Sequence, residues 1–448
     1  MRKEWLLLAT SVVLTLLVSL GIISWLAPGL LGVARDLQLV QIDEKVPPFY
    51  EGVLRREDFQ TNDFLLKDPV TRVRARPLLP MRIDGGPHDI LGFRNPAVPN
   101  IADVITIGDS MTYGNNALMG DNWPSRMQDL LASSPATVYN MSTGGWGAVQ
   151  YLNIFANATV FQPRVIVVAF YTGNDPLDSF MMVYGNSYWE WLRPDPSLSK
   201  ADAPQVAFPA PEDERWPVTF ADGVSTVFTP ALRLASNSEA PAVKAGYAIM
   251  ADVARRISGL DRNLGTRLVF TVIPTKELVY EQKVRRENLS APEEYLQLVA
   301  QERAHIDALE AVIRALPDAD YIDVLTPLQN AALGSRALYL QSGNGHPVAA
   351  GYNIIADTIA SGIRPMIPPQ PSGEFFLNEG EILTGLVVSE GKVWYFSSPQ
   401  VMEANGWSLV DVPEIKRRDI AGLEYGGMIN EIDPARFGPV KLALGKSL

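Results

Sequence analysis

Ser110 stands where a parallel sheet could present a nucleophile. It follows the apolar, β-branched run Val104–Ile107 within Gly108–Gly114, which reads GDSMTYG. If that run is a strand, Ser110 lies just beyond its carboxyl end, where such sheets bind ligands. A serine hydroxyl there can attack a carbonyl group when a base reaches it. The same residues also fit an ordinary turn in which Asp-Ser begins a helix.

The base for such a serine must come from a short list. The chain has three histidines, which are His88, His305 and His346. His346 precedes Pro347, which suits the first position of a helix, so His346 is expected in a loop at the edge of a cleft. The other two fall within a predicted helix and an irregular segment, so His346 is the candidate base. The plain alternative is a surface histidine.

Two more loops offer hydrogen-bond donors for a developing negative charge. The predicted strand at 137–140 leads into a glycine-rich loop that contains Gly145, whose N–H can point into a cleft. Asn174 follows the predicted strand Val165–Phe170, and its amide is a suitable donor for an oxyanion. Each loop alone also fits plain turn chemistry. The two positions are therefore candidate oxyanion-hole residues.

The elements that would position these residues alternate between strand and helix. Five β-rich apolar runs are predicted as strands: Val104–Ile107, Thr137–Asn140, Val165–Phe170, Leu268–Ile273 and Tyr321–Val324. Helical periodicity falls at 124–133, 147–160, 241–258, 292–315 and 347–361. This alternation predicts an α/β fold, a flavodoxin-like doubly wound five-stranded parallel sheet over residues 101–362.

Three segments lie outside the alternation. Residues 35–100 are polar and proline-containing and are predicted as a connector. Residues 176–238 form a long insertion rich in aromatic residues and proline, typical of a lid or a binding element. Residues 372–448 follow a proline cluster and contain a hairpin signal, Ile382–Val388 and Lys392–Phe396 around Ser-Glu-Gly. They are predicted as a small β-rich appendage.

The amino terminus predicts a membrane anchor. Residues 5–27 are uncharged and long enough to cross a hydrocarbon core of roughly 30 Å as a transmembrane helix. Arg2 and Lys3 precede them, so the amino terminus is expected in the cytoplasm and the rest of the chain outside it, in a periplasmic or extracellular location. A cleaved signal peptide ending near Ala34 is the alternative.

Composition excludes several classes of protein. Acidic residues outnumber basic ones by 50 to 38, giving a net charge of −12 that disfavours a nucleic-acid partner. The absence of cysteine excludes disulfides, thiolate metal sites and thiol nucleophiles. No metal-ligand spacing is present, and the proposed chemistry needs no cofactor.

Taken together and in this order, the four loops resemble those of the SGNH (GDSL-type) hydrolase family. The resemblance spans about residues 90–362, including Leu91–Arg94 and Ile273–Lys276. It implies that Ser110 is the nucleophile and His346 the base, and that the Ser110 N–H, the Gly145 N–H and the Asn174 amide form the oxyanion hole. The family usually has an aspartate three residues before the histidine. That position here is glycine, and Asn344 is the nearest polar substitute.

The resemblance implies a serine esterase of the cell envelope. Membrane-tethered relatives often remove or transfer O-acetyl groups on polysaccharides, so the expected partners are an acylated carbohydrate and, through residues 5–27, the lipid bilayer. An alternative is a weak or inactive SGNH-fold subunit that binds an integral membrane protein complex, which the missing aspartate favours. A lipase or thioesterase is a third reading and would require an apolar acyl groove.

Overall fold

The computed structural model describes residues 64–81, 85–131, 136–204, 210, 212–233, 237, 239–261, 265–378, 383–420 and 423–430. These residues divide into a larger unit that ends at Met366 and a smaller unit that begins at Ile367.

A five-stranded parallel sheet forms the centre of the larger unit. Its strands, in spatial order, are β4 (Val138–Asn140), β3 (Val104–Ile107), β5 (Val165–Tyr171), β8 (Arg267–Ile273) and β9 (Ala319–Tyr321). Numbered along the chain this order is 2-1-3-4-5, the order of flavodoxin-like sheets. Every residue of β3 and β5 is buried, because helices cover both faces. The predicted α/β sheet is thereby confirmed.

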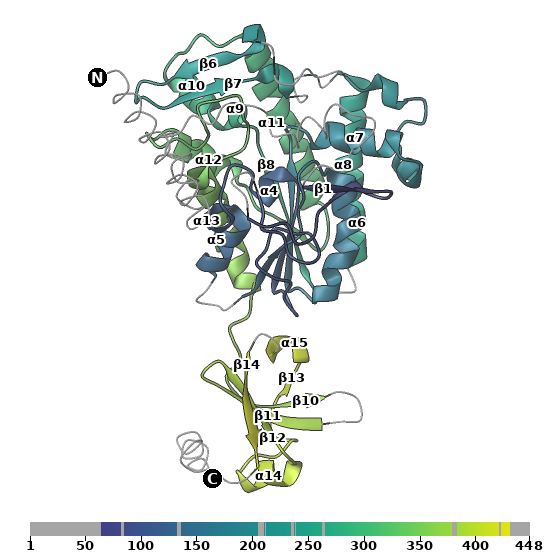
Figure 1. Cartoon of the computed structure of the whole chain (residues 1–448), viewed down its shortest axis with the longest axis vertical. Coiled ribbons are helices and arrows are strands. Elements are labelled where there is room, and N and C mark those ends of the chain that lie inside the picture. The colour runs from purple at the N-terminus through teal and green to yellow at the C-terminus, as the bar shows by residue number, and fades with distance from the viewer. Residues whose placement is uncertain are drawn as a thin grey trace, which may run out of the picture. The chain divides into compact units, whose positions relative to one another are not determined.

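Two groups of helices flank this sheet. On one side α5 (Trp123–Leu130) packs against α13 (Ala349–Ile363), and α13 packs against α12 (Leu325–Ala332). On the other side α8 (Pro241–Asp261) contacts α6 (Ala148–Ala158), α7 (Asp175–Gly185) and α11 (Glu293–Arg314), as Figure 1 shows. Three short helices follow strands of this sheet: α4 (Ser110–Tyr113) comes after β3, and α9 (Lys276–Val279) and α10 (Glu281–Arg286) come after β8.

The fifth strand differs from the expected one. It was expected at Tyr321–Val324 but runs over Ala319–Tyr321, because Val324 caps the start of α12 instead. Backbone pairing decides this boundary, since Leu268, Val269 and Phe270 of β8 pair with residues 319–321.

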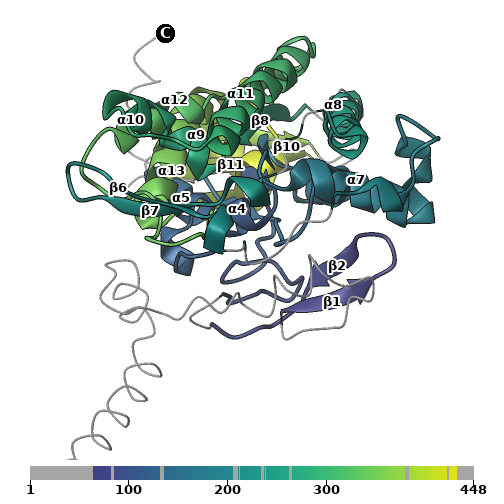
Figure 2. The ribbon, with the colours of Figure 1, turned by 90° about the horizontal axis from the view of Figure 1, so that it is seen from above.

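A hairpin occupies part of the predicted connector. Strands β1 (Leu65–Asp68) and β2 (Arg72–Ala75) pair antiparallel. Three side chains fasten the hairpin to the larger unit: Trp146 Nε1 donates to Val73 O at 2.8 Å, Gln150 Nε2 to Thr71 O at 3.3 Å, and Trp189 Nε1 to Val70 O at 2.7 Å. Figure 2 shows the hairpin beside α7. The connector prediction was thus wrong for these residues, because the tryptophans that hold the hairpin lie far along the chain.

The insertion is ordered into short elements. After α7 come 3-10 turns at Ser187–Leu192, Lys200–Asp202 and Glu212–Glu214, then the antiparallel pair β6 (Trp216–Thr219) and β7 (Ser225–Phe228), and a last turn at Pro230–Leu232. Phe228 is fully buried and lies close to Tyr280 and Tyr295. These rings pack the insertion onto the domain, while Tyr188 and Trp191 remain exposed.

The smaller unit is a mixed sheet with a core on each face. Its order is β13 (Glu414–Ile415), β10 (Gly373–Asn378), β11 (Leu383–Ser389), β12 (Lys392–Phe396) and β14 (Glu424–Ile429). Two helices accompany it, α14 (Pro399–Ala404) and α15 (Arg417–Ile420). The predicted hairpin is present, with Glu390 and Gly391 at positive φ in its turn. One core gathers around Leu386 and Ile420, and the other around Met402 and Trp407.

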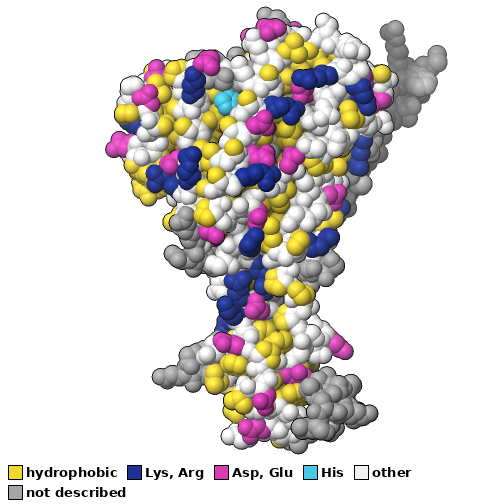
Figure 3. All heavy atoms as spheres, turned by 180° about the vertical axis from the view of Figure 1, so that it is seen from behind, with side chains coloured by type: hydrophobic (Ala, Val, Ile, Leu, Met, Phe, Trp, Pro, Cys, Tyr) yellow, Lys and Arg dark blue, Asp and Glu magenta, His cyan; other side chains and the backbone are white. Residues whose placement is uncertain are grey.

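Surface charge and the predicted membrane anchor are two further features of the chain. On the face shown in Figure 3, acidic and basic side chains are intermixed. The predicted anchor, residues 5–27, lies outside the described residues. Among the residues that are described, no helix combines the length and the apolar character needed to cross a bilayer.

Candidate active site

The segment Gly108–Gly114, which carries Ser110, is shaped by Asp109 and Gly114. Asp109 caps α4, since its Oδ1 accepts from Met111 N at 2.8 Å. The helix ends at Gly114, whose φ of +87° is in the left-handed region that favours glycine. Ser110 is thereby held at the amino-terminal end of a one-turn helix, immediately after a buried strand, with 3% of its surface exposed.

Ser110 and His346 meet directly although 236 residues separate them. His346 Nε2 lies 2.8 Å from Ser110 Oγ, a normal hydrogen-bond distance. The other ring nitrogen, Nδ1, lies 2.8 Å from Asn344 Oδ1, which is an acceptor. Nδ1 must therefore carry the proton, and Nε2 is left as the acceptor for the serine hydroxyl. The arrangement is a Ser–His–Asn chain.

The position of the acid substitute is two residues before the histidine. Gly343, the position at which the resemblance places an aspartate, does not face the ring, because a Cβ built there would lie 3.1 Å from Thr229 Cγ2. Asn344 faces it instead. The backbone N–H of His346 also donates to Asn344 Oδ1 at 3.0 Å, so one amide oxygen contacts the same histidine twice.

Positive charge surrounds this imidazole. The fully buried Lys276 donates through Nζ to Ser342 O at 2.5 Å and to Asn344 O at 3.0 Å. It therefore contacts the histidine loop, which comprises residues 342–346. The guanidinium of Arg233 lies against Gly345, where a Cβ would come within 2.3 Å of Nη2. Burial, together with these two cations, lowers the pKa of His346 to about 3. The ring is therefore neutral at ordinary pH and resists protonation.

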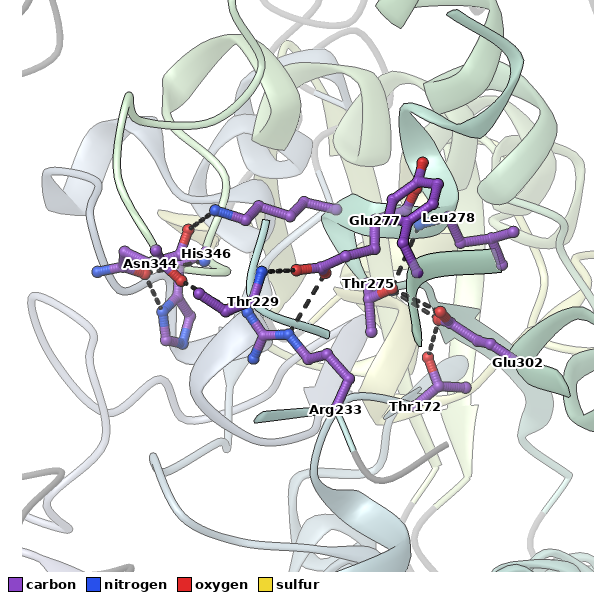
Figure 4. A network of polar contacts seen from close by, with 12 residues as sticks. Thr172, Thr229, Arg233, Thr275, Glu277, Leu278, Glu302, Asn344 and His346 are labelled. Atoms are coloured by element: carbon purple, nitrogen blue, oxygen red, sulfur yellow. Dashed lines mark hydrogen bonds and ion pairs between the residues drawn. The ribbon is translucent and has the colours of Figure 1, made fainter. Parts of the chain in front are cut away.

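The insertion supports the histidine loop from the outside. Thr229, just after β7, donates through its N–H to Glu277 Oε1 at 3.0 Å and through Oγ1 to Gly343 O at 3.5 Å. Arg233 pairs with Glu277 at 3.3 Å. Figure 4 shows the chain of contacts that runs from this pair toward His346. The insertion thus helps to fix where the imidazole lies.

The expected oxyanion donors lie at the ends of adjacent strands. Gly145 follows β4 and has a φ of +76°, a conformation that glycine adopts without strain. Asn174 directly precedes α7 after β5, and its Nδ2 donates one hydrogen to Asp178 Oδ2 at 2.5 Å. An amide nitrogen carries two hydrogens, so one remains for an oxyanion. Because β4, β3 and β5 are neighbours, both residues share the sheet edge at which Ser110 lies.

Three buried aspartates lie under the nucleophile. Burial raises the pKa of Asp109 to about 7, and it raises the pKa of Asp178 to about 6 although Asn174 and Arg72 oppose it. The pKa of Asp175 is also raised, by burial and by its neighbour Asp109. Asp109 Oδ2 accepts from Ser110 Oγ at 3.2 Å, so it shares the serine hydroxyl with His346.

Sequence reasoning missed several residues that the fold brings to this site. Their positions are Arg72, Asn116, Asp175, Asp178, Arg233 and Glu277. Asp175 and Asp178 carried a local signal, since two acids three residues apart in the first turn of a helix share one face. The arginines carried none, because their partners lie far away along the chain.

The chain was also compared with known proteins. No family model matches it, and no curated protein does. Solved structures that resemble it include a GDSL-like lipase from Bacteroides thetaiotaomicron, at 11% identity over 58% of this chain and 87% of that one, with a TM-score of 0.32. A catalytic mutant of an acetylxylan esterase from Geobacillus stearothermophilus is 10% identical over 60% of this chain and 95% of that one, with a TM-score of 0.33. An esterase from a Pseudoalteromonas species is 10% identical over 59% of this chain and 97% of that one, with a TM-score of 0.28.

Proposed function

We propose that this chain is a serine esterase of the SGNH type. The observation that carries the proposal is the continuous hydrogen-bonded chain from Ser110 Oγ through both nitrogens of His346 to Asn344 Oδ1, with 2.8 Å at each step. A hydroxyl, a neutral imidazole with its acceptor nitrogen toward that hydroxyl, and a group that orients the imidazole are the parts that acyl transfer requires.

In the proposed reaction Ser110 Oγ attacks the carbonyl carbon of an ester while its proton passes to His346 Nε2. The N–H groups of Ser110 and Gly145 and the second amide hydrogen of Asn174 stabilise the oxyanion. When the intermediate collapses, the imidazolium returns its proton to the leaving alcohol, and an acyl group stays on Ser110. Water then releases the acid, or a sugar hydroxyl accepts the acyl group.

We further propose that the natural substrate is an O-acetylated polysaccharide of the cell envelope. This rests on the sequence resemblance and on the expected membrane anchor at residues 5–27. A deacetylase and an acetyltransferase would use the same residues. A transferase also needs an acyl donor, which an integral membrane partner would supply.

One observation favours a second candidate, a weakly active or inactive scaffold. Nδ1 of the imidazole faces the Asn344 amide instead of a carboxylate, and the nearby Arg233 and Lys276 help to lower the pKa of His346 to about 3. A base that resists protonation is weak, so the acylation step is expected to be slower than in a site with an aspartate.

The test compares wild type with Ser110→Ala and His346→Ala on p-nitrophenyl acetate and on acetylated oligosaccharides. Nucleophile and base act as a unit, so each single change should remove nearly all activity above background and the double change little more. Labelling of Ser110 by a fluorophosphonate should be lost in Ser110→Ala. A wild-type rate equal to that of Ser110→Ala, with no labelling, would support the scaffold.

A further inference from the structure

We propose that Asn116 is a positioning residue that fixes the tautomer of His346. It does so by holding the Asn344 amide with its oxygen toward the imidazole. The inference rests on the proposed function for its catalytic meaning, but the geometry and its main readout do not depend on activity.

An asparagine beside a catalytic histidine can face it in two ways. With Oδ1 toward Nδ1, the ring carries its proton on Nδ1, and Nε2 can accept from serine. With Nδ2 toward Nδ1, the proton moves to Nε2, and the ring can no longer act as the base. In serine proteases in which asparagine replaces the aspartate, this wrong tautomer lowers kcat about 10⁴-fold. A site built on Asn344 therefore needs something that selects between the two orientations.

Asn116 supplies that selection. Asn344 Nδ2 donates to Asn116 Oδ1 at 3.1 Å, and Asn116 Nδ2 donates in turn to the backbone oxygen of His346 at 3.2 Å. Turning the Asn344 amide would set its oxygen against Asn116 Oδ1 and its NH2 group against the backbone N–H of His346. Both contacts would then be repulsive. The two amides thus form a closed circuit with the histidine, which holds the active orientation.

The loop that carries Asn116 is itself held firmly. Asn116 has a φ of +65°, a left-handed conformation in which asparagine is enriched. The fully enclosed guanidinium of Arg94 donates to the carbonyls of Tyr113, Gly114 and Ala117 on either side, at 3.1, 2.6 and 2.8 Å. Asn116 therefore links the loop after the nucleophile to the loop of the base.

The test is Asn116→Ala, read by nitrogen NMR of the histidine rings at pH 7.5. With three histidines in the chain, His346 can be assigned by comparison with His346→Ala. Wild type should show the proton on Nδ1. Asn116→Ala should show a substantial population with the proton on Nε2, and its kcat should fall about tenfold, the effect of one lost hydrogen bond to an oriented group. This tautomer readout does not require a substrate, so the inference can be judged even if the chain proves to be no esterase.

The same substitution in the Asn344→Asp variant distinguishes a positioning role of Asn116 from general damage to the site. A carboxylate presents oxygen in both orientations, so it needs no selection. Asn116→Ala should therefore cost far less activity in Asn344→Asp than in wild type, about threefold or less. Asn288→Ala is the matched control, since Asn288 also has a left-handed φ, +52°, but lies exposed on another helix end. It should leave tautomer and rate unchanged. An unchanged tautomer in Asn116→Ala, or an equal loss in both backgrounds, would overturn the inference.

Discussion

Asn344 is the residue that most distinguishes this site from an ordinary serine-hydrolase triad. It orients the imidazole through Oδ1 but offers no negative charge to stabilise the imidazolium. The nearby cations Arg233 and Lys276 act against protonation. Orientation and charge stabilisation, which one aspartate usually provides together, are separated here.

Asn344→Asp should therefore restore the missing charge. A carboxylate beside Nδ1 favours the imidazolium, so the pKa of His346 should rise from about 3 toward its ordinary value, and kcat should increase at least about tenfold. Asn116 can donate to the new carboxylate only by turning its own amide, which gives up its hydrogen bond to the His346 backbone oxygen. The measurements are kcat/KM as a function of pH and an NMR titration of His346.

The direction in which the rate changes with pH follows from the pKa of His346. In wild type the part of the acid limb set by His346 lies near pH 3, so His346 alone causes no loss of rate between pH 8 and pH 5. In Asn344→Asp the rate should fall as the pH drops through the raised pKa. Gly343→Asp is the matched control, because position 343 faces Thr229 rather than the ring. Gly343→Asp should keep the pH profile of wild type. If Asn344→Asp also kept it, the result would count against the role of Asn344.

At the scale of elements, two loops and one helical turn must meet for the site to exist. The loop after α4 is fixed by Arg94, whose Nε also donates to Gly86 O at 3.0 Å. The histidine loop is held by Lys276 from α9 and by Thr229 from the insertion. The positions of Ser110 and His346 are therefore set by side chains from three separate segments, not by the motifs alone.

Arg94→Ala should both destabilise the protein and lower its catalytic rate. The change leaves four buried backbone carbonyls without these donors, so the free energy of unfolding should fall by about 3 kcal/mol or more. The rate should fall as well, because the loop also carries Asn116. Urea unfolding and kcat are the measurements.

Arg74→Ala is the control for that change. The Arg74 side chain is 50% exposed and lies 3.9 Å from Asp68, so its loss should change the unfolding free energy by about 0.5 kcal/mol or less. If Arg94→Ala unfolded at the same urea concentration as Arg74→Ala, the loop would not depend on the guanidinium.

At the scale of the whole molecule, buried carboxylates should shape stability as a function of pH. Glu302 of α11 ties β5 and β8 together, accepting from Thr172 Oγ1 at 2.5 Å and from Thr275 N at 2.7 Å (Figure 4). Burial raises the pKa of Glu302 from 4.5 to about 7. Its protonated form is thus favoured by folding, and the stability from that proton is full below pH 4.5 and lost as the pH rises through 7.

Glu302→Gln should flatten this dependence. An amide cannot titrate, so the free energy of unfolding should change less between pH 5 and pH 8 in the variant than in wild type. Urea unfolding at several pH values measures the slope. Glu294→Gln, an exposed change on the same helix, should keep the wild-type slope. An equal slope in Glu302→Gln and wild type would mean that Glu302 stays ionised when folded.

The strand runs and the loop residues after them could be read from the sequence. The fully buried runs at β3 and β5 show no strict alternation of apolar and polar residues, since Thr106 is the one polar residue of β3. Ser110, Gly145 and Asn174 lie in the loops that follow the first three strands of the parallel sheet along the chain. The hairpin of the smaller unit was also predictable, because Glu-Gly between two β-rich runs is a local turn signal.

The sequence offered Asn344 as a substitute for the acid, but the contacts around His346 could not be read in the same way. Asn344 contacts the ring and Gly343 does not, because the direction of each side chain depends on how the loop lies against Thr229 and Lys276. Asn116 lies 230 residues from the histidine whose carbonyl it binds. Contacts over such separations are set by packing of the whole domain, and no short-range pattern encodes them. The sequence by itself determined the order of elements and the nucleophile and base to test. Only the tertiary structure decided which amide orients the base and which charges surround it, because burial and distance exist only once the chain is folded.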